Sequence, residues 1–273
     1  MPVRVTAQKL PQVRVFNAVG ISASLDKAEA MKAVGAEFLT ESVGDFLMPE
    51  KPDAEFDVNL GRLKLSPLPI LACNGFLRPA NFHCVGPDAN HQPILEWSEI
   101  AFRRLKQADG KFIVFGSGSA RQIPDGWSRE KARQQFVTLL KAMGELAKKL
   151  GVTVIIEQLQ ERECNFINRI IEGAEIVRAV AHPKVRLLAD LYHMAAMGDT
   201  PEDLKRSMDV ISHMEIAEKS ARSVPGVAGD DFRPYFRVVR ESGYQGAISI
   251  EGNYTDEQLA PAFKEIAKQA ASV

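Results

Sequence analysis

The stretch SREKARQQFVTLLKAMGELAKKLGVTVIIE (128–157) contains the unit whose repetition predicts the fold. Residues 128–151 place apolar side chains at helical spacing behind Ser128, a residue type that caps helix N-termini. Residues 152–157 form a short apolar run that suits a buried strand and ends in Glu157. A helix that leads directly into such a strand indicates alternating α/β structure.

The same alternation recurs along the chain. The expected strands are 13–19, 36–43, 69–74, 111–118, 152–157, 185–190, 209–217 and 246–251. The expected helices are 25–35, 54–65, 94–110, 128–151, 168–183, 201–208, 231–242 and 255–271. Eight such units predict a (β/α)8 TIM barrel, with a doubly wound open sheet as the alternative α/β fold. No linker or low-complexity tract interrupts the pattern, so we expect a single domain over residues 1–273.

Composition narrows the class of partner and the setting. The chain has 34 Lys and Arg against 35 Asp and Glu, so there is no broad basic field to bind nucleic acid or an anionic membrane. Its three cysteines, Cys73, Cys84 and Cys164, are odd in number and show no C-x-x-C spacing, which argues against a disulfide framework and a zinc knuckle. No signal-peptide core or membrane-length apolar run is evident. We expect a cytoplasmic protein.

Acidic residues mark four consecutive expected strands near their carboxyl ends. They are Glu157, Asp190, Glu215 and Glu251. Any one of them alone could cap the following helix. In a TIM barrel, however, strand carboxyl ends converge on the active-site face, where four carboxylates would repel one another without a cation. An oxygen-rich site of this kind suits Mn²⁺ or Mg²⁺ better than Zn²⁺ or Co²⁺, which remain alternatives.

Four segments of the second half also form a characteristic set. They are EQLQERECN (157–165), DLYHM (190–194), HMEIAEKSARSVPG (213–226) and GYQGAISIE (243–251). Together they resemble the xylose isomerase-like superfamily of sugar isomerases and epimerases, and within it the ketose 3-epimerases. The resemblance is clear over residues 150–273 and weaker before them. It implies a TIM barrel that binds a small-molecule sugar and assembles as a homodimer or homotetramer.

The resemblance also implies roles for individual residues. Glu157 and Glu251 match the two residues that bind the metal and act as the acid/base pair. Asp190 matches a further metal ligand. Substrate contacts are implied at three more positions, Glu163, His193 and Arg222.

The expected seventh strand departs from the family pattern. The epimerases that the chain resembles carry an H-x-H pair there, and the second His is a metal ligand. In this chain Glu215 occupies that second position and His213 the first. Residues two apart share one face of a strand, so we favour Glu215 as the ligand and keep His213 as the alternative.

A glycine-rich loop, FGSGSARQIPDGW (115–127), follows the expected fourth strand. Its backbone N–H groups and Arg121 are candidates to bind a phosphate or sugar oxygens. A flexible connecting loop without a ligand is the alternative.

The predicted function is that of a divalent-metal-dependent epimerase or isomerase of a keto sugar or its phosphate. Two Glu residues would move a proton through a metal-stabilised enediolate. The alternatives are a lyase or hydratase acting on a 3-keto sugar or glycoside, a non-catalytic sugar-binding barrel, and a DNA-repair enzyme similar to endonuclease IV. The last would require more histidine ligands and a basic surface.

Overall fold

A computed structural model describes residues 15–273 and shows a closed barrel of parallel strands. The strands pair in chain order, and the last pairs with the first. They are β1 (Val19–Ser22), β2 (Leu39–Ser42), β3 (Ile70–Asn74), β4 (Phe112–Phe115), β5 (Thr153–Glu157), β6 (Val185–Asp190), β7 (Ile211–Ile216) and β8 (Ile248–Ile250). This confirms the predicted TIM barrel. The expected domain limit at residue 1 lies outside the described residues and stays a prediction.

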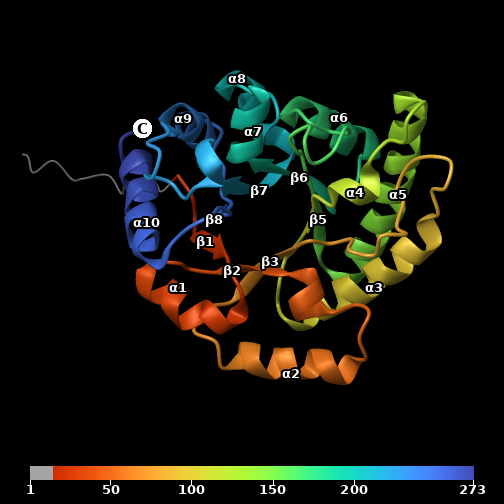
Figure 1. Cartoon of the computed structure of the whole chain (residues 1–273), viewed down its shortest axis with the longest axis horizontal. Coiled ribbons are helices and arrows are strands. Elements are labelled where there is room, and N and C mark those ends of the chain that lie inside the picture. Colours follow the sequence, from red (N-terminus) through yellow and green to blue (C-terminus); the bar gives the residue numbers. More distant parts are fainter. Residues whose placement is uncertain (1–14) are drawn as a thin grey trace, which may run out of the picture.

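Helices surround the strands (Figure 1). They are α1 (Ala28–Val34), α2 (Asp53–Lys64), α3 (His91–Gln107), α4 (Gly118–Arg121), α5 (Arg129–Leu150), α6 (Ile170–Val180), α7 (Leu191–Met197), α8 (Pro201–Lys205), α9 (Arg233–Glu241) and α10 (Asp256–Ala271). As expected, Ser128 caps α5: its side chain accepts a hydrogen bond from the Lys131 backbone N–H. Within residues 15–273, no helix is long and apolar enough to cross a membrane.

The predicted first strand, 13–19, is placed too early in the chain. Residues 13 and 14 lie outside the described part, and β1 begins at Val19, which is paired with Ile248 of β8. Val15 and Phe16 are buried, but they precede the sheet. The Phe16 ring lies edge-on against Phe236 of α9, with ring centroids 5.1 Å apart. A short apolar run that packs against a helix looks the same in a sequence as one that is buried in a strand. Periodicity therefore could not distinguish the two cases.

Several short helices were not predicted. They include α4, α7 and a π-helical turn, η2 (Val43–Leu47). The expected helix 201–208 ends early, at Lys205, and a 3-10 turn, η3 (Met208–Val210), occupies the start of the expected strand 209–217. Segments of four to seven residues are too short to show a helical period in the sequence.

The interior of the barrel has its own apolar layer, formed by Ala72, Val114, Ile155 and Leu188 with Phe112 packed against it. The His213 ring stacks on Phe112, with centroids 5.6 Å apart, and lies edge-on to Phe38 at 6.0 Å. His213 precedes Glu215 by two residues on β7, so it lies one layer deeper than the strand ends. The carboxyl-end face of the barrel therefore rests on an aromatic floor.

Gly20 of β1 leaves the space that the Phe38 ring fills. A Cβ atom at residue 20 would lie 2.4 Å from Phe38 Cε2. We expect Gly20→Ala to lower the free energy of unfolding by about 1–3 kcal/mol, the usual cost of overpacking, as measured by urea denaturation. The matched control is Gly61→Ala on the exposed face of α2, where no atom lies within 4 Å of the added methyl group. That variant should be about 0.5–1 kcal/mol more stable than the parent, because Ala favours helix. Equal stability of the two variants would contradict the close packing at Gly20.

Candidate active site

A cavity of about 460 Å³ lies at the carboxyl ends of the strands. Asn74 at the end of β3 and residues 116–119 after β4 form part of its lining. The rest includes five residues that the sequence singled out: Glu157, Glu163, His193, Arg222 and Glu251. Residues from six of the eight βα connections or strand ends thus meet in one cavity, at the face where TIM-barrel enzymes carry their active sites.

Four carboxylates meet at this face. One oxygen from each of them lies within 4.8 Å of the others, and the residues are Glu157, Asp190, Glu215 and Glu251. The first three are buried, and Glu251 is partly buried. The β6–β7 register places Asp190 directly beside Glu215, so neighbouring strands deliver two of the four side chains together. The structure therefore brings together the four side chains that the sequence proposed as metal ligands.

The Glu215 carboxylate provides a test of whether this site fits a metal ion. Both of its oxygens are buried and neither has a hydrogen-bond partner. A buried carboxylate without a partner is costly, so this group either takes up a proton, as its raised pKa favours, or binds a cation. Four carboxylates also supply the hard oxygen donors that Mg²⁺ and Mn²⁺ prefer. The donor set fits a divalent ion.

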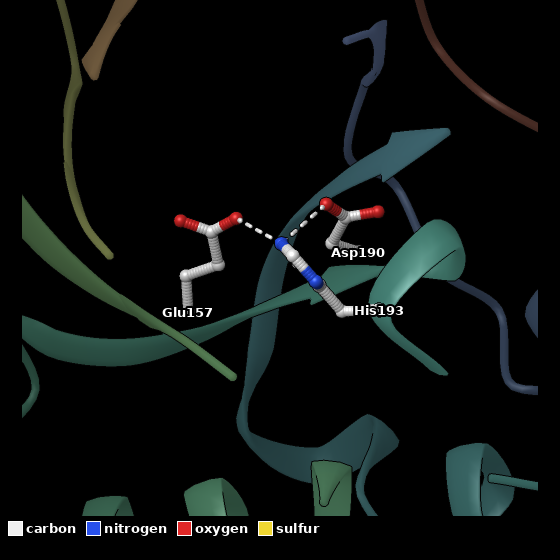
Figure 2. Close-up of side chains that lie close together, drawn as sticks. All are labelled: Glu157, Asp190 and His193. Atoms are coloured by element: carbon white, nitrogen blue, oxygen red, sulfur yellow. Dashed lines mark ion pairs between the residues drawn. The ribbon is translucent and has the colours of Figure 1, made fainter. Parts of the chain in front are cut away.

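His193 joins this cluster through α7. Asp190 caps that helix by accepting a hydrogen bond from the Tyr192 backbone N–H at 2.8 Å, which places His193 in the first turn. Figure 2 shows the His193 ring between two carboxylates: Nε2 is 3.6 Å from Glu157 Oε1 and 3.5 Å from Asp190 Oδ2. The other ring nitrogen, Nδ1, accepts the Gln160 backbone N–H at 3.2 Å. Burial lowers the pKa of His193 to about 4, so the neutral ring carries its proton on Nε2, facing the carboxylates.

Arg222 provides a fixed positive charge at the cavity. Its Nη2 contacts the Glu251 carboxylate and lies 3.3 Å from Asp190 Oδ2, while its Cζ lies 4.8 Å from the centre of the Tyr192 ring. Burial alone would lower the pKa of this guanidinium, but the Glu251 and Asp190 carboxylates outweigh it and raise the pKa above its usual value. Asn74 Nδ2 donates to the other Glu251 oxygen at 2.7 Å. Glu251 is thus held on both oxygens.

The backbone that presents Arg222 is unusual. Ala221 and Arg222, in the 3-10 turn η4 (Ser220–Arg222), both have positive φ, at 55° and 50°. Left-handed backbone costs non-glycine residues about 1–2 kcal/mol each, so other contacts must hold it. Asn253 supplies two of them: its N–H donates to the Arg222 carbonyl at 2.7 Å and its Nδ2 to the Ala221 carbonyl at 2.8 Å.

Glu218 holds the rest of this loop. Its side chain is fully buried and accepts backbone N–H groups from Gly226 at 2.8 Å, Gly229 at 2.9 Å and Asp230 at 3.2 Å. The Ala228 N–H and the Ser223 hydroxyl also donate to it. Burial would raise the pKa of Glu218, but these donors lower it overall, so the group stays ionised. One carboxylate therefore closes the loop that carries Arg222.

Two predicted residues lie elsewhere. Arg121 is fully buried on α4, and its Nη2 donates to the Glu157 backbone carbonyl at 2.7 Å, so it has no exposed surface from which to contact a substrate. His213 lies on the aromatic floor, outside the carboxylate cluster, and burial lowers its pKa to about 3. The geometry therefore favours Glu215 over His213 as a ligand.

Glu218 was missing from the predicted site, and Asn74 had no individual role in it. Asn74 ends the expected strand 69–74 and belongs to the loop 73–84, a segment that could line the pocket, as it does. For Glu218, the sequence shows an acidic residue before a loop that contains Gly226 and Gly229. The structure shows that the backbone N–H groups of these two glycines donate to its carboxylate.

Residues 25–272 match the xylose isomerase-like TIM barrel family. The chain belongs to this family. An inosose isomerase from Halalkalibacterium halodurans is 29% identical over 134 residues, 45% of this chain and 47% of that protein. A 3-dehydro-D-guloside 4-epimerase from Escherichia coli is 27% identical over 178 residues, 63% of this chain and 68% of that protein. A D-allulose 3-epimerase from Methylomonas sp. shares the fold, with a TM-score of 0.76 at 18% identity over 92% of this chain and 97% of that one.

The matches to curated relatives cover only part of each protein. The chain spans between 47% and 58% of the length of three of the curated relatives, namely the inosose isomerase, a 2-oxo-tetronate isomerase from Cupriavidus necator and a putative hydroxypyruvate isomerase from Danio rerio.

The carboxylate cluster should make stability depend on pH when no metal is present. Burial, followed by mutual repulsion, raises the pKa of Glu157 and Glu215 well above the usual value, and burial raises that of Asp190 to about 6. Unfolded carboxyl groups titrate near about 4. The folded cluster thus binds more protons above that pH, so its contribution to stability is fully present at low pH and is lost as pH rises through about 6 and beyond.

We expect the Tm of the chelator-treated protein to fall by several degrees between about pH 5 and pH 8, since 1 kcal/mol corresponds to about 2–4 °C at this size. Mg²⁺ or Mn²⁺ should restore Tm at the higher pH and have little effect at the lower. Glu215→Gln, with one fewer carboxylate, should show a shallower pH dependence. A flat profile for the parent protein would exclude strong repulsion in the cluster.

The loop closed by Glu218 should open when that carboxylate is replaced. Glu218→Gln replaces one carboxylate oxygen by an amide nitrogen, which cannot accept hydrogen bonds from the backbone N–H groups of the loop. We expect peptides covering residues 219–230 to exchange amide hydrogens about 10–100 times faster, the effect of losing charged hydrogen bonds worth about 1.5–3 kcal/mol. Glu175→Gln on the exposed face of α6 is the control and should leave this region unchanged. Parent-like exchange in Glu218→Gln would show that other contacts hold the loop.

Proposed function

We propose that the chain is a divalent-metal-dependent epimerase or isomerase of a keto sugar. The observation that carries this proposal is the pair Glu157 and Glu251, which line one cavity from strands β5 and β8 and belong to one carboxylate cluster. Strands five and eight stand apart in the closed barrel, so the two carboxylates approach a bound molecule from different sides. The names of the isomerase and epimerase relatives support the same reaction class.

Metal binding is assigned to four side chains, Glu157, Asp190, Glu215 and Glu251. The oxygen-only donor set favours Mg²⁺ or Mn²⁺ over softer ions. A divalent ion held there would act as a Lewis acid on the carbonyl group and the neighbouring hydroxyl of a sugar.

Two side chains of the protein carry out the proton transfers. Glu157 removes the proton from the carbon beside the carbonyl group, and Glu251 returns a proton to the same carbon from the other side, which inverts that centre. Return of the proton to the adjacent carbon instead gives an isomerase.

The remaining cavity residues orient the sugar. His193 presents its Nε2–H between Glu157 and Asp190, where it can donate to a substrate oxygen. Arg222 holds Glu251 in place and can donate to a second oxygen. Glu163 is more exposed, accepts Gln160 Nε2 at 2.6 Å and reaches the outer part of the cavity.

Replacement of either base tests the proposal. We expect Glu157→Gln and Glu251→Gln each to lower solvent deuterium incorporation into a keto sugar by about 100-fold or more, since Gln keeps the volume but cannot accept the proton. Incorporation is measured by NMR in D₂O with added Mn²⁺ or Mg²⁺. The control is Glu161→Gln, an exposed residue of the same loop as Glu163. Circular dichroism and Tm should show that all three variants fold. Near-normal incorporation in either base variant would refute the two-base assignment.

A further inference from the structure

We infer that the substrate is an uncharged keto sugar or keto glycoside rather than a sugar phosphate or a keto acid. This inference rests on the proposed function and specifies the class of molecule that the same cavity accepts. It is carried by the distribution of charged and neutral groups over the cavity.

Negative charge dominates the cavity and the layer directly beneath it. Glu163 adds a fifth carboxylate to the four of the cluster. Metal ligands bind as carboxylates, so a divalent ion cancels only half of the charge of its four ligands. Arg222 and the buried Arg121 behind Glu157 each offset one further charge. A protonated His193 would offset one more and still leave the set without any positive excess.

No described residue offers a free cation to an anionic substrate in this cavity. Arg222 is the one Arg or Lys in the lining of the described part, and it is already paired with Glu251 and Asp190. Arg121 is fully buried behind Glu157. Arg162, in the loop of Glu163, donates to Gln160 Oε1 at 3.0 and 3.1 Å and does not line the cavity.

The remaining polar wall is neutral. It consists of Asn74 and the Gly-Ser-Gly-Ser run at residues 116–119. Two glycines of this run are required by close approach: a Cβ at Gly116 would lie 2.3 Å from Glu157 Oε2, and one at Gly118 would lie 2.5 Å from the Glu163 carbonyl oxygen. The run therefore packs tightly against the acidic wall. Hydroxyl and amide groups of this kind pair with sugar hydroxyls, which both donate and accept, without needing charge on the ligand.

The test compares matched pairs of probes in the deuterium-incorporation assay with Mn²⁺ present. One pair is D-fructose and D-fructose 6-phosphate; a 3-keto glucoside and hydroxypyruvate extend the comparison. We expect incorporation per unit of enzyme to be at least about tenfold greater for the uncharged member, because the site repels a further negative charge. Preference for the phosphate or the keto acid would overturn the inference and leave the proposed function standing. Absence of incorporation with every probe would instead withdraw the proposed function, and the inference with it.

A positive charge introduced at Ser119 tests whether charge, rather than the shape of the cavity, sets the preference for the uncharged substrate. Ser119 lines the cavity and is exposed. In Ser119→Lys, the ratio of D-fructose to D-fructose 6-phosphate incorporation should fall by about tenfold, while Ser119→Gln, of similar length and no charge, should keep the parent ratio. Raising the ionic strength should reduce the difference between the parent and Ser119→Lys, because salt screens the added charge. Equal ratios in the parent, Lys and Gln proteins would show that charge does not select the substrate.

Discussion

Mutual repulsion between buried carboxylates is the constraint on which the rest of this structure depends. The β6–β7 register sets Asp190 beside Glu215, and β5 and β8 bring Glu157 and Glu251 to the same point. Such a group is tolerated only when bound protons or a cation reduce its negative charge. Arg222 supplies part of that compensation, and the geometry leaves room for a divalent ion to supply the rest. The aromatic layer beneath, with Phe112 and His213, offers no polar partner from below.

The loop that holds Arg222 against this cluster has a strained backbone. Two consecutive residues adopt left-handed backbone, which is rare for residues with a Cβ atom. Glu218 and Asn253 stabilise that conformation mainly by binding backbone groups of the loop, and the Ser223 hydroxyl adds one side-chain contact to Glu218.

Much of the fold and of the site could be predicted from the sequence, for identifiable reasons. Eight apolar runs alternating with helical patterns predict the barrel, and the strand-end rule predicts that Glu157 and Glu251 meet. The first strand was misplaced because Val15 and Phe16 are buried against a helix rather than in the sheet. The hydrogen bond between Asn74 and Glu251 could not be predicted, since the two residues lie 177 positions apart and nothing in the sequence links them. The burial of Arg121 could not be predicted either, because its side chain is positioned by a four-residue helix that is too short to show a helical period in the sequence.

Asp190 is at once the last residue of β6, the N-cap of α7 and a member of the carboxylate cluster. The start of that helix and the cluster therefore depend on the same carboxylate. Its Oδ1 accepts the Tyr192 N–H, while its Oδ2 faces His193 and Arg222. Any residue that replaced Asp190 would have to satisfy a helix terminus and a charged cavity with one short side chain. A replacement at Asp190 is therefore constrained by two contacts at once, whereas the longer Glu side chains around it reach the cluster without capping a helix.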